Sequence, residues 1–379
     1  MTTEGLVARV DSAERVAHLD SAVYTVPTDT PEADGTLAWD STTLALATVH
    51  CADVTGLGYT YAPAATAYVI GDLLADVVTG ASVFDVPRLN EAMQRAVRNA
   101  GLPGVCAQAV SAVDIALWDA KARLLGLPLV RLLGAARDDV PVYGSGGFTT
   151  YDDQQQDRQL RDWVEKEGIP RVKIKIGDSW GQRESRDRRR VAQARASIGE
   201  AAELYVDANG GYSAKQAVRV AAALADQGVT WFEEPVSSDH LRTLAAIRGR
   251  IGVDVTAGEY GYTLPYFQHM LGAGAVDCLQ ADVTRCGGVT VWLRVATLAQ
   301  AHGLDISGHC APHAHAHAAA AVPNLRHLEW FHDHIRIERL LFDGTLDPSG
   351  GDITPGTDGP TGLGLSLNTE RAEPFRQVR

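Results

Sequence analysis

The chain has 379 residues, of which 45% are hydrophobic and 21% charged, a profile typical of a folded globular protein with two domains or one large barrel with additions. Its formal net charge of −13 argues against a nucleic-acid partner, because phosphate binding needs clustered Lys and Arg side chains. No apolar run reaches the ~18 residues of a membrane helix and the chain start is charged throughout, so we expect no membrane span and no signal peptide.

Residues 1–138 are predicted to form an α+β domain that caps a larger one. The segment 23–39 is rich in Pro, Asp, Thr and Gly, which predicts a long loop. Such loops in enzymes often close over a substrate, so we expect residues 25–38 to be a lid, with an ordinary surface loop as the alternative. Strand alternation over 42–62 then predicts a hairpin, and helical spacing follows it over 67–78, 89–100 and 107–126.

Residues 139–345 repeat one pattern: a helix-like stretch, a Gly, a short apolar strand and a polar residue at the strand end. With 140–147 as the first strand, the repeat predicts a modified (β/α)7β TIM barrel, and residues 346–379 are expected to return to the capping domain. A doubly wound open sheet is the alternative, but it would gather ligands at one switch point. The polar strand-end residues are Lys175, Asp207, Glu233, Glu259, Asp282, His309 and Glu329.

Three carboxylates, Asp207, Glu233 and Glu259, end successive predicted strands. In a barrel they would converge at the C-terminal mouth, where their like charges need a cation. Oxygen ligands without a nearby Cys favour Mg²⁺ over Zn²⁺. The alternative is that each carboxylate pairs separately with a neighbouring Lys or Arg.

Two acid–base groups are expected on either side of these carboxylates. Lys173 and Lys175 are two apart on one strand, so both point into the mouth, and we expect the neighbouring ammonium and the cation to lower the pKa of Lys175. Asp282 and His309 end successive strands, where the carboxylate can fix the tautomer of the imidazole. Glu329 could serve a developing oxyanion if protonated, with a barrel-rim ion pair as the alternative.

Together these motifs resemble the enolase superfamily and, within it, the mandelate racemase subgroup. The resemblance covers nearly the whole chain, through SAVDIALWDAKARLLGLPLVRLLG, VKIKIG, VDANGGY, WFEEP, AGEYGY, QADVTRCGG and SGHCAPH. A Lys in place of Asp282 would have indicated the muconate-lactonizing type. The resemblance implies Mg²⁺ ligands at Asp207, Glu233 and Glu259, a base at Lys175, a dyad of His309 with Asp282, and an electrophilic acid at Glu329.

The resemblance also implies a reaction, in which the α-proton of a Mg²⁺-chelated carboxylate is removed and the metal, Lys173 and Glu329 stabilise the enediolate. We expect dehydration of an acid sugar to a 2-keto-3-deoxy acid, with a racemase or epimerase of a 2-hydroxy acid as the alternative. Members of the family assemble as dimers or octamers, so a homo-oligomer is expected. Polar candidates for substrate contact are Asn209, Thr25, Asp29, Asp40 and Tyr61.

A different class of function starts from the run HCAPHAHAH, whose histidines could make the protein a zinc-dependent barrel hydrolase. Such an enzyme would carry HxH on its first strand, where this chain has YGSGG. We therefore expect His313, His315 and His317 to lie on the chain that leads into the following helix. A non-catalytic scaffold is disfavoured because no residue of the expected catalytic set is missing.

Five cysteines are scattered along the chain, without a CxxC pair. Their odd number and spacing make a disulfide framework improbable, and we expect reduced thiols in a cytoplasmic protein.

Overall fold

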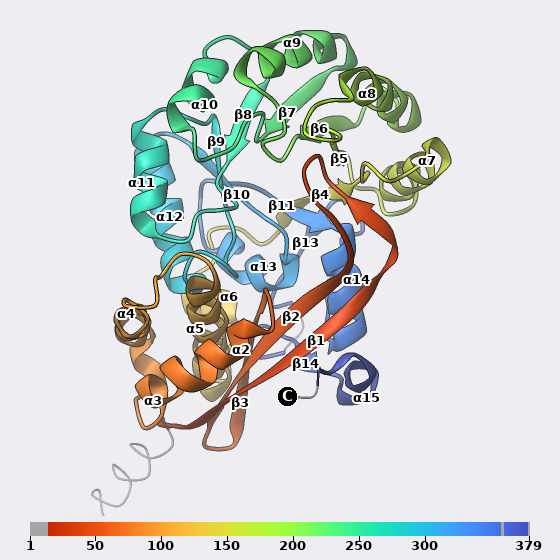
Figure 1. Cartoon of the computed structure of the whole chain (residues 1–379). Coiled ribbons are helices and arrows are strands. Elements are labelled where there is room, and N and C mark those ends of the chain that lie inside the picture. Colours follow the sequence, from red (N-terminus) through yellow and green to blue (C-terminus); the bar gives the residue numbers. More distant parts are fainter. Residues whose placement is uncertain (1–13, 358–359, 378–379) are drawn as a thin grey trace, which may run out of the picture.

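The computed structural model describes residues 14–357 and 360–377. It consists of a β/α barrel and a smaller domain that packs below it, with the C-terminal segment returning to the smaller domain (Figure 1). No helix among these residues is both long and apolar enough to cross a membrane. All five cysteines are buried, and none of them forms a disulfide.

The capping domain is built on a three-stranded antiparallel sheet of β1 (Val16–Ala33), β2 (Ala38–Cys51) and β3 (Val54–Tyr61). The sheet is followed by α2 (Ala65–Val69), the π-helix η1 (Ile70–Leu74), α3 (Ala75–Val78), the 3₁₀-helix η2 (Val83–Asp85), α4 (Val86–Ala96), α5 (Val105–Leu124) and α6 (Leu129–Leu133).

The segment 23–39 is a β-hairpin rather than the predicted loop. The β1–β2 ladder continues to the pair Ala33 and Ala38, with an irregularity between Pro27 and Glu32. Prolines are tolerated because β1 is an edge strand of this sheet, so one side of its backbone needs no ladder partner. In Figure 1 the hairpin rises from the capping domain towards β4 and β5 of the barrel.

Helix α5 is the buried support of the capping domain, and it lies very close to β3. A Cβ added at Gly58 would stand 2.1 Å from the carbonyl oxygen of Ala112, and one at Gly56 would stand 2.2 Å from that of Ala116. Only glycine permits this approach of helix to strand.

The barrel contains eight parallel strands, closed by pairing of the last with the first, in the part of the chain that the structure describes. Each strand is joined to the next by a helix, so the predicted TIM barrel with a capping domain is confirmed. The strands are β4 (Val140–Gly146), β5 (Arg171–Lys175), β6 (Glu203–Asp207), β7 (Val229–Glu233), β8 (Asp254–Ala257), β9 (Cys278–Ala281), β10 (Asp305–Gly308) and β11 (Leu325–Phe331).

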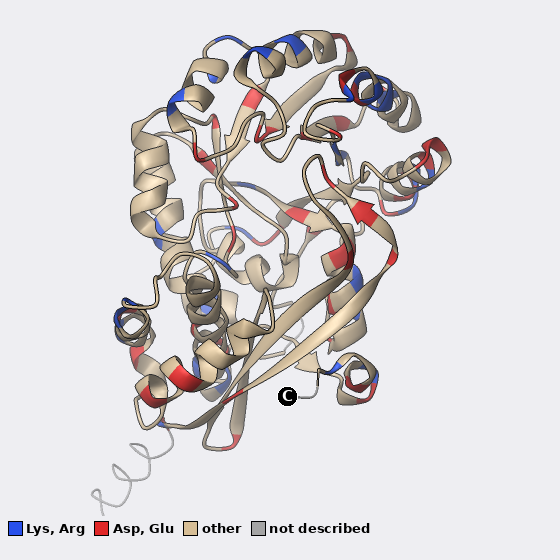
Figure 2. Ribbon diagram, in the orientation of Figure 1, with Lys and Arg blue, Asp and Glu red and all other residues tan. Residues whose placement is uncertain are grey.

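The barrel helices form the outer ring, where Lys and Arg residues gather, on α8 in particular (Figure 2). They are α7 (Asp153–Arg161) with the π-helix η3 (Asp162–Lys166), α8 (Glu184–Ile198), α9 (Ala214–Leu224) with the 3₁₀-helix η4 (Ala225–Gln227), α10 (Leu241–Arg248), α11 (Leu264–Gly272), α12 (Gly288–Ala301), α13 (Pro312–Ala320) and α14 (His332–Leu341).

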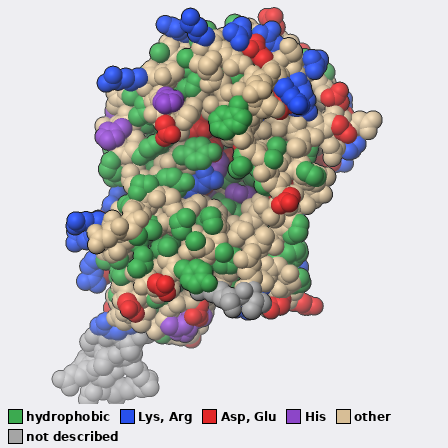
Figure 3. Space-filling view, viewed as in Figure 1, with side chains coloured by type: hydrophobic (Ala, Val, Ile, Leu, Met, Phe, Trp, Pro, Cys, Tyr) green, Lys and Arg blue, Asp and Glu red, His purple; other side chains and the backbone are tan. Residues whose placement is uncertain are grey.

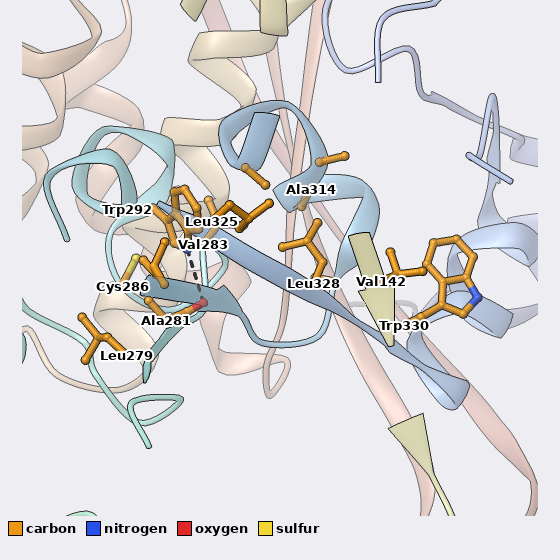
Figure 4. Close-up of a cluster of buried hydrophobic side chains, with 14 of the residues drawn as sticks. Val142, Leu279, Ala281, Val283, Cys286, Trp292, Ala314, Leu325, Leu328 and Trp330 are labelled. Carbon is orange, nitrogen blue, oxygen red and sulfur yellow. Dashed lines mark hydrogen bonds between the residues drawn. The ribbon is translucent and has the colours of Figure 1, made fainter. Parts of the chain in front are cut away.

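Strand alternation divides the barrel side chains into two sets. Outward residues such as Val142 and Leu328 pack in the core between strands and helices, where the Trp292 indole donates to the Ala281 carbonyl at 3.3 Å (Figure 4). Inward residues form layers, and the layer below the mouth is aromatic. Its buried cluster comprises Tyr143, Tyr205, Trp231 and Cys278.

The C-terminal segment follows α14 through β12 (Phe342–Asp343), β13 (Asp352–Ile353), β14 (Ser366–Leu367), α15 (Thr369–Ala372) and the 3₁₀-helix η5 (Glu373–Phe375). Short β13 pairs with β4 of the barrel. Near its end the segment contacts the capping domain, where the Gln377 backbone N–H donates to the Val23 carbonyl at 2.9 Å. The chain therefore ties the two domains together at its end.

Candidate active site

Strand register brings the predicted site residues side by side at the C-terminal mouth of the barrel. Lys175 pairs with Asp207 across β5 and β6, and Asp207 pairs with Glu233 across β6 and β7. Glu259 follows Gly258, whose φ of 140° and closeness to the Gln280 carbonyl exclude a side chain there. The mouth appears in Figure 3 as a hollow between the two domains, where charged and His side chains are visible among apolar ones.

The three carboxylates converge as predicted. Asp207, Glu233 and Glu259 are buried, and one ligand oxygen from each lies within 4.8 Å of the others. The Oε1 atom of Glu233 is buried without a hydrogen-bond partner. Burial, which outweighs the attraction of Lys173, raises the pKa of Glu233, and Asp207 raises it further. An unpartnered oxygen within an all-oxygen donor set fits a hard divalent cation.

Lys173 lies among these carboxylates at the bottom of the site. Its Nζ is fully buried, 2.6 Å from Oε2 of Glu233 and 2.9 Å from Oε1 of Glu329. Although burial lowers its pKa, the Glu233 and Glu329 carboxylates outweigh this effect and raise it. Lys173 is therefore a fixed positive charge.

Lys175 lies nearer the opening, with Nζ 2.5 Å from Oδ2 of Asp207. Burial lowers its pKa, but the Asp207 carboxylate outweighs burial and the net pKa is raised. This differs from the lowered pKa predicted for Lys175, because the prediction assumed a cation on the same carboxylate. A cation that binds Asp207 would compete with the ammonium group and remove the interaction that raises the pKa.

On the other side of the mouth His309 and Asp282 form the expected pair, with Nδ1 of the ring 2.9 Å from Oδ2 of the carboxylate. Nε2 of His309 faces Glu259 at 3.3 Å. Burial lowers the pKa of His309, but Glu259 and Asp282 outweigh it and the net pKa is raised. Arg285, 3.3 Å from Asp282, adds a second positive partner for that carboxylate.

Glu329 is held as an acceptor. Its Oε1 accepts a 2.5 Å hydrogen bond from the Ser145 hydroxyl, and its Oε2 accepts one of 3.0 Å from the Cys310 backbone N–H. Burial raises its pKa, but Lys173 and His309 outweigh burial and hold the pKa well below the usual range. This arrangement favours the carboxylate form of Glu329, and a role of Glu329 as an acid in the reaction stays a prediction.

Backbone strain is concentrated at the same mouth. Asn209, Glu234, Cys310 and Ala311 have φ values of 45°, 38°, 51° and 38°, in the left-handed region that non-glycine residues avoid. Each follows a barrel strand whose end carries a site residue. Such strain is retained where the surrounding structure fixes a functional geometry.

The tip of the β1–β2 hairpin lies over the β5 and β6 ends of the mouth. The Trp180 backbone N–H donates to the Gly35 carbonyl at 2.9 Å. A Cβ at Gly35 would stand 2.6 Å from the Ile176 carbonyl oxygen. Asp34 is close enough for Lys175 to lower its pKa, although burial outweighs that effect and raises it. No pattern in the sequence indicates Asp34 as a site residue, because only the hairpin brings it to the mouth.

An apolar wall completes the mouth beside Lys175. The Phe331 ring centroid is 5.8 Å from the Lys175 Nζ, and Phe148 packs edge-on against Phe331 at 5.7 Å and against Trp39 at 5.6 Å. Trp39 comes from the hairpin and the other two from the barrel, so the wall joins both domains.

The predicted substrate-contact residues lie in different places. Asn209 is beside the carboxylates, where its backbone N–H donates to Oδ1 of Asp207 at 2.8 Å and its buried side-chain Oδ1 has no partner. Thr25 bonds Thr43, and Asp40 bonds its exposed neighbour Ser41.

The remaining two candidates face barrel side chains outside the mouth. Asp29 pairs with His332 at 3.0 Å, and the Tyr61 ring stacks on His334 with centroids 3.3 Å apart. A role of all five candidates in substrate binding stays a prediction.

The three additional histidines lie in α13 and are engaged separately. Nδ1 of His313 bonds Glu338, His315 accepts from the Val283 N–H at 2.8 Å, and His317 accepts from the Val130 N–H at 3.1 Å. They therefore hold α13 in place and do not converge on one ion.

Family models and known proteins match both domains of the chain. A family model described as enolase C-terminal domain-like matches residues 155–372, and one described as mandelate racemase / muconate lactonizing enzyme, N-terminal domain, matches residues 22–134. L-talarate/galactarate dehydratase of Salmonella typhimurium is 31% identical over 77% of this chain and 74% of its own length. D-galactarolactone cycloisomerase of Agrobacterium fabrum is 30% identical, over 92% of this chain and 95% of its own.

Solved structures extend the comparison to three dimensions. A mandelate racemase/muconate lactonizing enzyme-like protein from Rubrobacter xylanophilus is 51% identical with a TM-score of 0.92, covering 96% of this chain and 100% of that one. A racemase from Streptomyces coelicolor with bound magnesium is 29% identical with a TM-score of 0.89 and the same coverage. Fold and site define a capped β/α-barrel enzyme. The chain belongs to the enolase superfamily and, within it, to the mandelate racemase subgroup.

Proposed function

We propose that the protein dehydrates an acid sugar: it removes the proton α to a carboxylate and expels the hydroxyl of the neighbouring carbon, giving a 2-keto-3-deoxy acid. The observation that carries this proposal is the pair of acid–base groups, Lys175 and His309, on opposite sides of three converging carboxylates. The dehydratase from Salmonella typhimurium among the relatives supports the same reaction class.

Asp207, Glu233 and Glu259 would hold Mg²⁺, for which their buried oxygens and the unpartnered Oε1 of Glu233 are suited. The racemase from Streptomyces coelicolor carries magnesium, which supports this choice of ion. When bound, the ion supplies a Lewis acid to the substrate carboxylate.

The residues of the chain then divide the proton transfers between them. Lys175, as the neutral amine, takes the α-proton, and Lys173 donates hydrogen bonds to the developing enediolate oxygen. His309, oriented by Asp282, donates its proton to the departing hydroxide, so that water leaves as the C–O bond breaks. The resulting enol becomes the 2-keto acid.

A racemase or epimerase is the second candidate, favoured by the same opposed geometry. If the substrate lacks a hydroxyl in position to leave, His309 can return a proton to the face opposite Lys175. The two reactions give different products from one intermediate.

The test is a screen of purified, Mg²⁺-loaded protein against a library of acid sugars that includes galactarate and L-talarate. We expect formation of a 2-keto acid from at least one of them, and no product from the Lys175→Ala variant. Inversion of the α-carbon without 2-keto acid, followed by NMR, would favour the racemase. If no acid in the library loses its α-proton to D₂O solvent, the proposal of α-proton abstraction is wrong.

We further propose that the protein functions in the cytoplasm as a homo-oligomer, a dimer or an octamer. All five cysteines are buried and none forms a disulfide, which supports a reducing compartment. Light scattering on the purified protein tests the assembly, and a monomer at working concentration would contradict it.

A further inference from the structure

A second group of metal-ligand side chains lies outside the three-carboxylate site, where the hairpin meets the barrel. Asp29 and Glu32 come from β1 and His332 is the first residue of α14. One ligand atom from each lies within 4.8 Å of the others, and Nε2 of His332 is 3.0 Å from Oδ2 of Asp29. The group therefore joins the capping domain to the barrel.

Glu32 gives this group a buried oxygen without a hydrogen-bond partner. Its side chain is 0% exposed, its Oε2 accepts a 2.9 Å hydrogen bond from the Trp39 indole, and its Oε1 is buried without a partner. The hydroxyl of Thr30 is also buried without a partner. A buried carboxylate with an empty acceptor position is costly unless a proton, a water or a cation occupies it.

The positive groups around Glu32 are too few to balance the neighbouring carboxylates. Asp333 is a further buried carboxylate next to Glu32, and it raises the pKa of Glu32 in addition to the larger effect of burial, to about 9. Arg336 is already engaged, at 2.6 Å from Asp333 and 2.8 Å from the Pro27 carbonyl. Three carboxylates thus share one guanidinium group and the imidazole of His332.

A cavity of about 590 Å³ gives solvent ions a path to the group. Asp29, Thr30 and His332 line it, beside α7, η3 and α14. Its lining carries as many acidic as basic side chains, since Asp29, Asp162 and Glu167 face Arg158, Arg336 and Arg339. The residues of the three-carboxylate site do not line this cavity.

We propose that Asp29, Glu32 and His332 bind a second divalent cation, of the class that accepts imidazole together with carboxylate ligands, such as Co²⁺, Mn²⁺ or Zn²⁺. The ion fills the empty position on Glu32 and links the hairpin to α14. A donor set of one nitrogen and two oxygens distinguishes it from the all-oxygen site of the mouth. This inference does not depend on the proposed reaction.

The position of the site gives it a mechanical consequence. Both chain neighbours of Glu32 bond to the barrel. The Ala33 carbonyl accepts from the Thr149 backbone N–H at 2.8 Å, and the Pro31 carbonyl accepts from the Thr150 hydroxyl at 2.6 Å. An ion on Glu32 adds a link between these contacts and α14, so the bound state favours the hairpin lying over the mouth.

Co²⁺ is the probe, because its visible absorption reports an imidazole ligand and a low coordination number. Protein held in excess Mg²⁺ is titrated with Co²⁺ by calorimetry and absorption. The wild type is expected to bind one Co²⁺ that Mg²⁺ does not displace. Glu32→Gln, which keeps an acceptor for Trp39, and His332→Gln should each weaken this binding at least tenfold. Matched controls are Glu370→Gln and His302→Gln, at exposed positions on α15 and at the end of α12.

Three further measurements keep the result interpretable. Asp207→Asn, which removes a ligand of the mouth, should leave the Co²⁺ signal in place. Circular dichroism in chelator checks that each variant is folded, and hydrogen exchange of residues 27–39 should slow with Co²⁺ in the wild type but not in Glu32→Gln. Equal Co²⁺ binding by wild type and Glu32→Gln would overturn the proposal, as would a wild type that binds no Co²⁺ beside Mg²⁺, since a proton would then be the occupant of Glu32.

Discussion

His309 and Asp282 directly follow neighbouring strands, β10 and β9, and their side chains meet at 2.9 Å between Nδ1 and Oδ2. This contact turns Nε2 of the imidazole towards Glu259, across the carboxylates from Lys175. Each acid–base group can therefore reach only one face of a carbon held between them.

Single substitutions can show which of the two groups acts on each face of the substrate carbon. In an anti elimination, His309→Asn should abolish turnover yet leave exchange of the α-proton with deuterium, whereas Lys175→Ala should abolish both. Each loss should amount to about 10²- to 10⁴-fold, the usual contribution of a general acid or base. NMR of the substrate in D₂O measures the exchange.

Other outcomes of this experiment are equally specific. In a syn elimination, where His309 is both base and acid, His309→Asn should remove exchange as well. Near-normal rates in both variants on the identified substrate would show that the opposed arrangement is not used.

Metal removal should abolish activity and Mg²⁺ should restore it. Glu233→Gln should weaken Mg²⁺ binding, because it removes the charge of a ligand whose Oε1 has no other partner. Glu203→Gln, at the opposite end of the neighbouring strand β6, is the control. Calorimetry measures the affinity, and full activity of a metal-free preparation would contradict the assignment.

The hairpin tip should act as a lid, and Gly35→Ala tests its closed position. A Cβ there would stand 2.6 Å from the Ile176 carbonyl and 2.8 Å from that of Gly177, so the tip must move away. We expect a raised KM and faster hydrogen exchange over residues 25–38. Leu37→Ala, at an exposed side chain of the same turn, should change neither. An unchanged KM in Gly35→Ala would separate the hairpin from substrate binding.

The close contact of α5 with β3 should limit stability. Gly58→Ala places a Cβ 2.1 Å from the Ala112 carbonyl, and overpacking of this kind costs about 1–3 kcal/mol or more in the free energy of unfolding. Gly71→Ala, where a Cβ meets nothing within 4 Å, should be neutral or stabilising. Urea unfolding compares the two variants, and equal midpoints would contradict the contact.

A surface ion cluster that joins α8 to α9 gives a pH-dependent prediction. Hydrogen bonds from Arg219 and Arg188 lower the pKa of Glu184 to about 2. Because the folded-state pKa lies below the unfolded value, the stabilisation is present above pH ~4.5 and is lost as pH falls towards ~2. Glu184→Gln should lower stability at pH 7 by less than about 1 kcal/mol, less in high salt, and the difference should vanish at the acid end. A difference that persists at pH 2 would have another cause.

The sequence by itself determined the residues of the site and their order around the barrel. Lys175, Asp207 and Glu233 each end an apolar strand. Because strands and helices alternate along the chain, all these strand ends lie at the C-terminal mouth of the barrel. The convergence of the three side chains therefore follows from local pattern. The same reasoning placed His309 beside Asp282, because successive parallel strands are neighbours.

Only the tertiary structure decided the contributions of the hairpin and the ionisation of the site. Residues 23–39 have the composition of a loop, and they form a ladder because an edge strand tolerates Pro27 and Pro31. Asp34 and Trp39 reach the mouth through that hairpin. They lie far along the chain from the barrel strands, so the strand–helix repeat does not predict their position at the mouth. The ionised state of Glu329 depends on Lys173 and His309, which are brought to it from other strands. Local pattern fixes which residues point inward, whereas long-range packing fixes which charges they meet.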